Sequence, residues 1–200
     1  MTVLFFDTET TGIPNFRLPI DDPCQPYLVQ IAGILTDDAG KVLAQLSMIV
    51  NSDVDVPEAA SNVHGITRER AAALGAPVPV VLAPFFHLWL RADLVVAHNL
   101  PFDEFVLKSA ITRYWGAHRT LPEKPGFCTL KASAPIVNLP ATPRMLAAGI
   151  KGPKSPRLDE AYQYFFGDGV LSGAHDALVD ATACMRIYFR LQEGKQAEAA

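Results

Sequence analysis

The sequence has 200 residues and a mass of 21.7 kDa, which is the size of one ordinary domain. Half of the residues are hydrophobic, 19% are charged and the mean hydropathy is +0.17, which excludes a disordered chain and provides enough apolar side chains for a sizeable core. The 17 basic and 21 acidic residues give a net charge of −4, which argues against a protein that coats nucleic acid through a general basic excess.

The first quarter of the chain is predicted to form three strands. A β-branched and aromatic run over 2–6 indicates a buried strand. Residues 13–26 contain four prolines and are expected to form a loop. Strands over 28–36 and 42–50 enclose a turn at 37–40, which is the pattern of a β-hairpin.

The middle of the chain is predicted to be mostly helical. Pro57 is a typical first residue of a short helix, and Thr67 is able to cap the next one. The apolar run over 78–91 is long enough for a third helix. The expected elements are helices over 57–63, 67–74 and 78–91, a short strand over 94–97 and a helix over 101–114.

The last third is predicted to contain the longest irregular segment, over 138–156, with four prolines, two glycines and three basic residues. A single domain over 1–192 with a flexible tail over 193–200 is expected. Strands followed by alternating helices and short strands indicate an α/β domain with a mixed sheet. The other expected elements are a loop over 116–126, a strand over 127–130, and helices over 131–136, 157–166 and 176–191.

The sequence predicts a protein of the cytoplasm without a membrane partner. It has no apolar run of 18 residues and no secretory signal at its start. Cys24, Cys128 and Cys184 are odd in number and far apart, which indicates neither a disulfide framework nor a CxxC metal site and suits a reducing compartment.

Asp7 and Glu9 follow the first strand and are candidate metal ligands. Residues two apart in an extended chain point to one face, here that of Val3 and Phe5. Adjacent carboxylates repel unless a cation lies between them, and their oxygens suit Mg²⁺ or Mn²⁺. A solvated strand end before a turn at Gly12 is the competing interpretation.

Asp103 lies where the strand over 94–97 meets the next helix. It falls in the first helical turn, where the helix dipole favours an anion, so capping alone would also explain it. Sites in open α/β sheets collect at strand ends, which supports Asp103 as a site residue.

His175, Asp176 and Asp180 form the third candidate group. Asp176 is a good N-cap, which places His175 just outside the helix and Asp180 one turn inside it. Because Asp176 is expected to cap, Asp180 is the preferred ligand. A capping aspartate beside an exposed histidine and a solvated acid is the alternative.

In this order and spacing, the chain resembles the DEDD superfamily of 3′→5′ exonucleases, in its histidine-bearing DEDDh branch. The three family motifs correspond to residues 6–12, 98–103 and 175–181. The segment Val-His-Gly-Ile-Thr at 63–67 is similar to one in relatives of the proofreading subunit of bacterial DNA polymerase III.

The resemblance implies a ribonuclease H-like fold with a central mixed β-sheet flanked by helices. It implies two Mg²⁺ or Mn²⁺ ions and makes His175 the general base. The implied metal ligands are Asp7, Glu9, Asp103 and Asp180. The implied partner is the 3′ end of single-stranded nucleic acid, with DNA favoured and nucleoside 5′-monophosphates released.

Substrate contacts are expected from residues close to these motifs. Backbone N–H groups around Thr10 and Gly12 are placed to meet the terminal sugar or phosphate, and His64 and Phe102 to form a stacking wall. Capping of a turn by His64 and core packing of Phe102 are the alternatives. The full expected set is Thr8, Thr10, Gly12, His64, Phe102 and Lys154, with Lys151 and Arg157 beside Lys154 along the strand's path.

The sequence departs from the family pattern in two respects. The helix before 63–67 often carries a substrate-contacting glutamate, and here that position is Ala59, with Glu58 beside it. The loops over 13–26 and 138–156 are longer and richer in proline than the minimal pattern, so substrate preference is not carried over.

Other functions are compatible with the same motifs. An exoribonuclease or oligoribonuclease would use the same active site, a phosphohydrolase would act on mononucleotides, and a catalytically inactive scaffold would only bind nucleic acid. Filled positions for all five catalytic residues disfavour the scaffold. No segment predicts contact with a polymerase.

Overall fold

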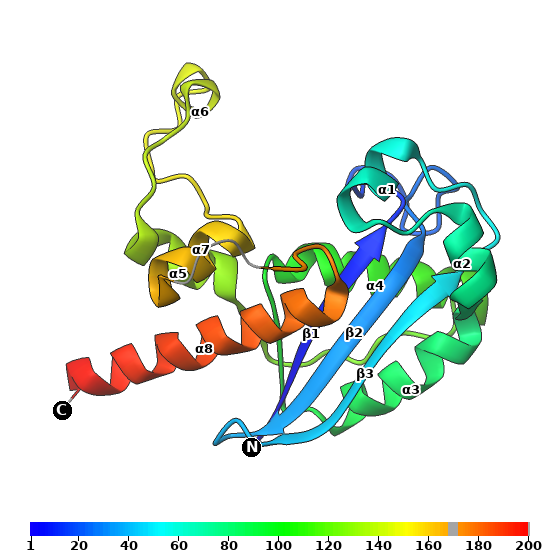
Figure 1. Ribbon diagram of the computed structural model, residues 1–200, viewed down its shortest axis with the longest axis horizontal. Coiled ribbons are helices and arrows are strands. Elements are labelled where there is room, and N and C mark those ends of the chain that lie inside the picture. Colours follow the sequence, from blue (N-terminus) through cyan, green and yellow to red (C-terminus); the bar gives the residue numbers. More distant parts are fainter. Residues whose placement is uncertain (168–171, 200) are drawn as a thin grey trace.

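The computed structural model describes residues 1–167 and 172–199, with side chains to residue 194. After an initial run of three strands, short strands lie between helices, and the described chain ends in a run of consecutive helices (Figure 1). In chain order they are β1 Thr2–Thr10, β2 Leu28–Asp37, β3 Val42–Asn51, α1 Glu58–His64, α2 Arg68–Leu74, β4 Ala76–Pro77, α3 Val78–Arg91, β5 Leu94–Ala97, α4 Leu100–Trp115, β6 Gly126–Cys128, α5 Thr129–Val137, α6 Pro143–Ala147, α7 Leu158–Phe166 and α8 Ala177–Ala199.

The strands form one mixed sheet in the order β4-β3-β2-β1-β5-β6. Strands β1, β2 and β3 pair antiparallel as a meander, whereas β5 pairs parallel with β1, and β6 with β5. Parallel neighbours require a crossover, and α3 and α4 provide it before β5 and β6. The predicted mixed sheet with flanking helices is confirmed.

Strand β1 is buried on both faces because its side chains alternate between two cores. Leu4 and Phe6 pack in the core that contains α3 and α4, including Trp89. Val3 and Phe5 pack in the opposite core, against α8. Figure 1 shows α8 crossing one face of the sheet with α4 behind it. Residues that follow along β1 therefore face α8 or α4 in turn.

Strand β1 is longer than the predicted strand over 2–6. It continues to Thr10 because β2 pairs with it along its whole length, with a register shift between Glu9 and Thr10. Asp7 and Glu9 therefore lie within the strand, on the face that carries Val3 and Phe5.

Two segments in the last third differ from the sequence-based expectation. The strand predicted over 127–130 is β6, which ends at Cys128, and Leu130 belongs to α5. The segment over 138–156 is not wholly irregular: it forms an arm that contains α6 and is closed at its root by a bridge between Leu139 and Lys154. Figure 1 shows this arm projecting from the body of the protein.

The ends of the other elements agree with the sequence within a few residues, except that the helix predicted over 176–191 is α8, which continues to Ala199. Thr67 caps α2 by accepting a hydrogen bond from the Arg70 N–H, and Gly167 ends α7 in the left-handed region. Helix α8 runs to Ala199, and the division between a domain over 1–192 and a tail over 193–200 stays a prediction. Residue 200 lies outside the described residues. No helix in the described ranges is both long and apolar enough to cross a membrane.

Candidate active site

Four carboxylates from three parts of the chain meet where β1 ends. Asp7 and Glu9 lie on the face of β1 that is covered by α8. Asp103 lies in the first turn of α4 and Asp180 in the first turn of α8. Asp103 is 2% exposed and Asp180 8% exposed, so Asp180 is not the solvated acid of the alternative interpretation.

The charges of Asp103 and Asp180 raise the pKa values of Asp7 and Glu9, so the four carboxylates lie close together. Burial raises the pKa of Glu9 to about 8, and the charges of Asp180 and Asp103 add to this. Burial followed by the charge of Asp103 raises the pKa of Asp7 well above its usual range. Without a cation, this site therefore binds protons near neutral pH.

At Asp103 and Asp180, hydrogen bonds partly counteract the increase in pKa that burial causes. Burial raises the pKa of Asp103 to about 7, although hydrogen bonds from Thr8 lower it. Burial raises the pKa of Asp180 to about 6, although the backbone N–H of His175 lowers it. That N–H donates to Asp180 Oδ2 at 3.1 Å.

Thr8 binds Asp103 from within β1. Its backbone N–H donates to Asp103 Oδ1 at 3.0 Å and its hydroxyl donates to the same oxygen at 2.7 Å. Thr8 points to the α4 side of β1, whereas Asp7 and Glu9 point to the α8 side. The carboxylates therefore reach the site from both faces of the strand, and the Thr8 side chain, predicted to contact substrate, is engaged by Asp103.

Asp176 caps α8, as the sequence predicts. Its Oδ1 accepts from the N–H groups of Leu178 at 3.0 Å and Val179 at 3.3 Å. Its Oδ2 accepts from Gln30 Nε2 at 2.9 Å. Both carboxylate oxygens of Asp176 are therefore occupied, whereas the Oδ1 of Asp180 is buried without a hydrogen-bond partner in the described residues.

His175 lies just before α8 with an exposed side chain. Its backbone φ is +68°, a left-handed conformation that few non-glycine residues adopt. One nitrogen of its imidazole and one oxygen each from Glu9 and Asp180 lie within 4.8 Å of one another. These three side chains form a group that is able to hold a metal ion, so the structure places His175 at the site.

The turn after β1 is held by side chains that the sequence singled out. The Thr10 hydroxyl donates to the Gly12 carbonyl at 2.5 Å. His64 Nδ1 accepts from the Ile66 N–H at 3.1 Å, so its proton is on Nε2, which lies 3.2 Å from the Thr10 carbonyl and donates to it. Burial lowers the pKa of His64. His64 is only 9% exposed, and both of its ring nitrogens are engaged in hydrogen bonds.

The remaining predicted contacts lie at the root of the arm and on α4. Phe102 is half-buried against the core. Lys154 is paired with Glu160, with Nζ to oxygen distances of 2.6 and 2.7 Å. His98, from the second motif, bridges Thr129 Oγ1 and the carbonyl of Pro156, each at 3.0 Å. His98 therefore fixes the root of the arm beside the strand end.

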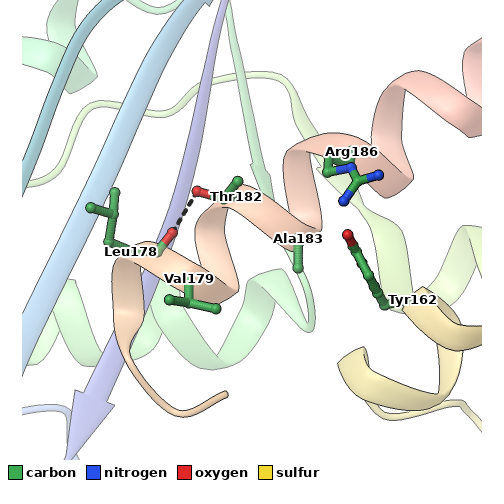
Figure 2. Close-up of a pocket in the computed structure, with 6 residues that line it drawn as sticks. All are labelled: Tyr162, Leu178, Val179, Thr182, Ala183 and Arg186. Carbon is green, nitrogen blue, oxygen red and sulfur yellow. Dashed lines mark hydrogen bonds between the residues drawn. The ribbon is translucent and has the colours of Figure 1, made fainter. Parts of the chain in front are cut away.

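A separate hollow of about 270 Å³ lies between α7 and α8 (Figure 2). The Arg186 guanidinium stacks over the rings of Tyr162 at 5.0 Å and Phe166 at 4.4 Å. The lining contains neither the carboxylates nor His175, so the hollow belongs to the packing of these helices. Its lining residues are Tyr162, Leu178, Val179, Thr182, Ala183 and Arg186.

Gln30 is a residue of this region that sequence reasoning missed. It is 5% exposed, pairs with Glu9 across the β1–β2 ladder, and contacts the start of α8. In the sequence, Gln30 is a polar residue that interrupts the apolar run of β2, and this pattern could have identified it. Buried polar groups need hydrogen-bond partners, so such a residue indicates a specific contact.

Comparison with known sequences supports a nuclease. The sequence pattern of the family described as Exonuclease (RNase_T) matches residues 4–188. A DNA polymerase III subunit epsilon-like protein of Rhodobacter capsulatus is 34% identical over 113 residues, which are 56% of this chain and 15% of that protein. The chain therefore spans a small part of the length of this relative.

Solved structures share the fold at low sequence identity. Escherichia coli exonuclease I in complex with a dT13 oligonucleotide is similar with a TM-score of 0.70 and 20% identity, over 99% of this chain and 42% of that chain. The moderately thermophilic exonuclease I of Methylocaldum szegediense is similar with a TM-score of 0.67 and 21% identity, over 98% of this chain and 41% of that chain. These similarities confirm the expected ribonuclease H-like fold.

Proposed function

The chain belongs to the exonuclease family, and we propose that it is a DEDDh 3′→5′ exonuclease that releases nucleoside 5′-monophosphates from single-stranded DNA. The observation that carries the proposal is the convergence of four carboxylates with raised pKa values and one exposed histidine at the end of β1. Repulsion within such a cluster lowers the stability of the folded protein unless a cation binds between the carboxylates.

The four carboxylates are the proposed ligands of two Mg²⁺ or Mn²⁺ ions. Two features support this: the charges of Asp103 and Asp180 raise the pKa values of Asp7 and Glu9, and the buried Oδ1 of Asp180 accepts no hydrogen bond from any described residue. In a related structure, E. coli exonuclease I with single-stranded DNA is in a zinc-bound form. When bound, two divalent ions lower the pKa of an attacking water and stabilise the leaving 3′ oxygen.

His175 is the proposed general base. Its exposed imidazole stands at the start of α8, where it is able to accept the proton of the attacking water. The water oxygen bonds to phosphorus and the bond from phosphorus to the 3′ oxygen breaks, which releases the terminal nucleoside 5′-monophosphate. The 3′ oxygen of the shortened strand takes a proton from solvent and becomes a free 3′ hydroxyl. The hydrogen bond from its backbone N–H to Asp180 keeps His175 beside the ligand cluster.

The strand end is proposed to lie along the turn after β1. The Thr10 hydroxyl and the His64 ring hold this turn, so its backbone meets the terminal nucleotide in a fixed geometry. The face of the His64 ring and the half-buried Phe102 are the proposed stacking surfaces for the last base. Thr8 contributes by holding Asp103, and Lys154 by fixing the arm through Glu160.

DNA is the favoured substrate because the structural neighbours bind dT13 and dA16 oligonucleotides. The test is degradation of 5′- and 3′-labelled single-stranded DNA and RNA in parallel, with Mg²⁺ or Mn²⁺. Stepwise shortening of 5′-labelled DNA, with release of the 3′-terminal label as a mononucleotide, is expected. Faster degradation of RNA would favour the oligoribonuclease alternative, and no degradation of either would contradict the proposal.

A further inference from the structure

Gln30 connects the middle of the sheet to the first turn of α8. Its Nε2 donates to Asp176 Oδ2 at 2.9 Å and to Ser47 Oγ at 3.3 Å. Its Oε1 accepts from the backbone N–H of Ala177 at 3.2 Å. Both ends of this buried amide are therefore engaged, and two of its three partners belong to the start of α8.

The contact completes the hydrogen bonding of the α8 N-terminus. The first N–H groups of a helix have no partner within the helix and need an outside acceptor when buried. Asp176 supplies this acceptor for Leu178 and Val179, and its carbonyl accepts from Asp180. The N–H of the fully buried Ala177 is left, and Gln30 accepts it from another element of the fold.

The start of α8 also positions two residues of the site, His175 just before the helix and Asp180 in its first turn. His175 immediately precedes the cap, with a left-handed backbone and an N–H bonded to Asp180. Gln30 also pairs with Glu9 across the β1–β2 ladder. One residue of the sheet therefore connects the start of α8 to the strand that carries Asp7 and Glu9. A shift of this start would move His175 and Asp180 together, away from Glu9.

We propose that Gln30 is a positioning residue, which sets the distance of His175 and Asp180 from the β1 carboxylates through its amide contacts to Asp176 and Ala177. The catalytic part of this inference rests on the proposed function. The hydrogen-bond part concerns the fold of this chain and is testable in a protein with no activity.

The polarity of the contacts explains why an amide is needed. Position 30 must donate to the Asp176 carboxylate and accept from the Ala177 N–H, and only an amide side chain of this length does both. Gln30→Glu places two carboxylates in contact, and Asp176→Asn lets two amide NH₂ groups face each other. The two changes together restore a donor and an acceptor, because asparagine also caps helices and the Ser47 hydroxyl is able to turn and donate.

The kinetic test compares Gln30→Met, Gln30→Glu, Asp176→Asn and the Gln30→Glu/Asp176→Asn double variant in the full chain. A displacement of about 1 Å in a catalytic group costs on the order of 100-fold in rate, so each single variant is expected to lose about 10–100-fold in kcat with little change in KM. The double variant is expected to recover at least ten-fold over either single variant. Ser47→Ala, which removes only the third contact, is the matched control and keeps the wild-type kcat.

Wild-type kcat in Gln30→Met, or a double variant no better than the single variants, would overturn the positioning role. If KM rose and kcat fell in every variant, Ser47→Ala included, in proportion to the decrease in its melting temperature, the role of Gln30 would be stability alone.

Hydrogen exchange separates this inference from the proposed function. In Gln30→Met the Ala177 amide has no acceptor, so it is expected to exchange at least ten-fold faster, whereas amides in the middle of α8 stay protected. An unchanged Ala177 amide would overturn the contact itself. A wild-type protein that degrades no nucleic acid would contradict the proposed function and leave this result standing.

Discussion

Thr8 gives two hydrogen bonds to one oxygen of Asp103, one from its backbone N–H and one from its hydroxyl, across 95 positions of sequence. This double contact joins the central strand to the first turn of α4. It also lowers the pKa of Asp103 against the effect of burial. Thr8 therefore favours the charged form of a carboxylate that is expected to bind metal.

Removal of the Thr8 hydroxyl is expected to weaken metal binding at neutral pH. In Thr8→Val the pKa of Asp103 rises further above about 7, so a larger fraction of the group is protonated at pH 7. Activity at limiting Mn²⁺ is expected to fall about ten-fold at pH 7 and to recover toward pH 9, since a hydrogen bond to a charged group contributes about 1.5–3 kcal/mol. Thr8→Ser is the control, and a serine variant as impaired as the valine variant would contradict the role of the hydroxyl.

Each carboxylate of the cluster is expected to be essential for activity and unfavourable for stability without metal. Asp7→Asn, Glu9→Gln, Asp103→Asn and Asp180→Asn should each lose nearly all activity. Their melting temperatures in chelator should equal or exceed that of the wild type, because repulsion within the cluster falls. Glu104→Gln, next to Asp103 but paired with Lys108, is the control. Near-normal turnover of Asp180→Asn would exclude Asp180 as a ligand.

His175 is expected to act in proton transfer and not in metal binding. A positioned base contributes about 10²–10⁴-fold in rate, so His175→Ala should lose activity on that order. Calorimetric titration with Mn²⁺ should show both binding events of the wild type. Since His175 lies within ligand distance of Glu9 and Asp180, the titration decides between two arrangements. Loss of one binding event would make His175 a ligand.

The stability of the metal-free protein is expected to fall as the pH rises. Glu9 has a pKa of about 8 in the folded protein against an ordinary value of 4.5, so between these values the folded state binds more protons than the unfolded chain. The free energy of unfolding therefore decreases with rising pH in that window. Melting temperatures in chelator at pH 5, 6.5 and 8 should decline in that order, and Glu9→Gln should decline less.

Added Mn²⁺ should reverse this loss. At 100 times its dissociation constant a ligand stabilises the folded state by about 2.7 kcal/mol, which is on the order of 5–10 °C for a chain of this size. A melting temperature that rises with pH without metal, or no shift with Mn²⁺ at pH 8, would contradict the charge state inferred for the cluster.

The arm over 138–156 is expected to guide long strands through two basic residues. Lys154 is paired with Glu160 and Arg157 with Asp159, whereas Arg144 and Lys151 form no ion pair with any described residue. Arg144→Glu/Lys151→Glu should raise KM about ten-fold for a 20-nucleotide strand and leave KM for a dinucleotide unchanged. Lys41→Glu, in the β2–β3 turn, is the control. Equal effects on both lengths would exclude the arm from the strand's path.

Most of the helices and strands, and most of the candidate residues, follow from local patterns in the sequence. Strand and helix patterns, the Thr67 and Asp176 caps and the glycine stop after α7 depend on neighbours within a few positions, so local reasoning reached them. The acids stood out because Asp7 and Glu9 extend the apolar face of Val3 and Phe5.

How these residues act together depends on contacts between elements that are far apart in the sequence. Thr8, predicted to contact substrate, binds Asp103, and Gln30 reaches Asp176 across 146 positions of sequence. The extension of β1 to Thr10 required β2 as its partner. Side-chain hydrogen bonds between distant elements depend on sheet register and helix placement, and these follow from the packing of the whole core, which no local pattern encodes.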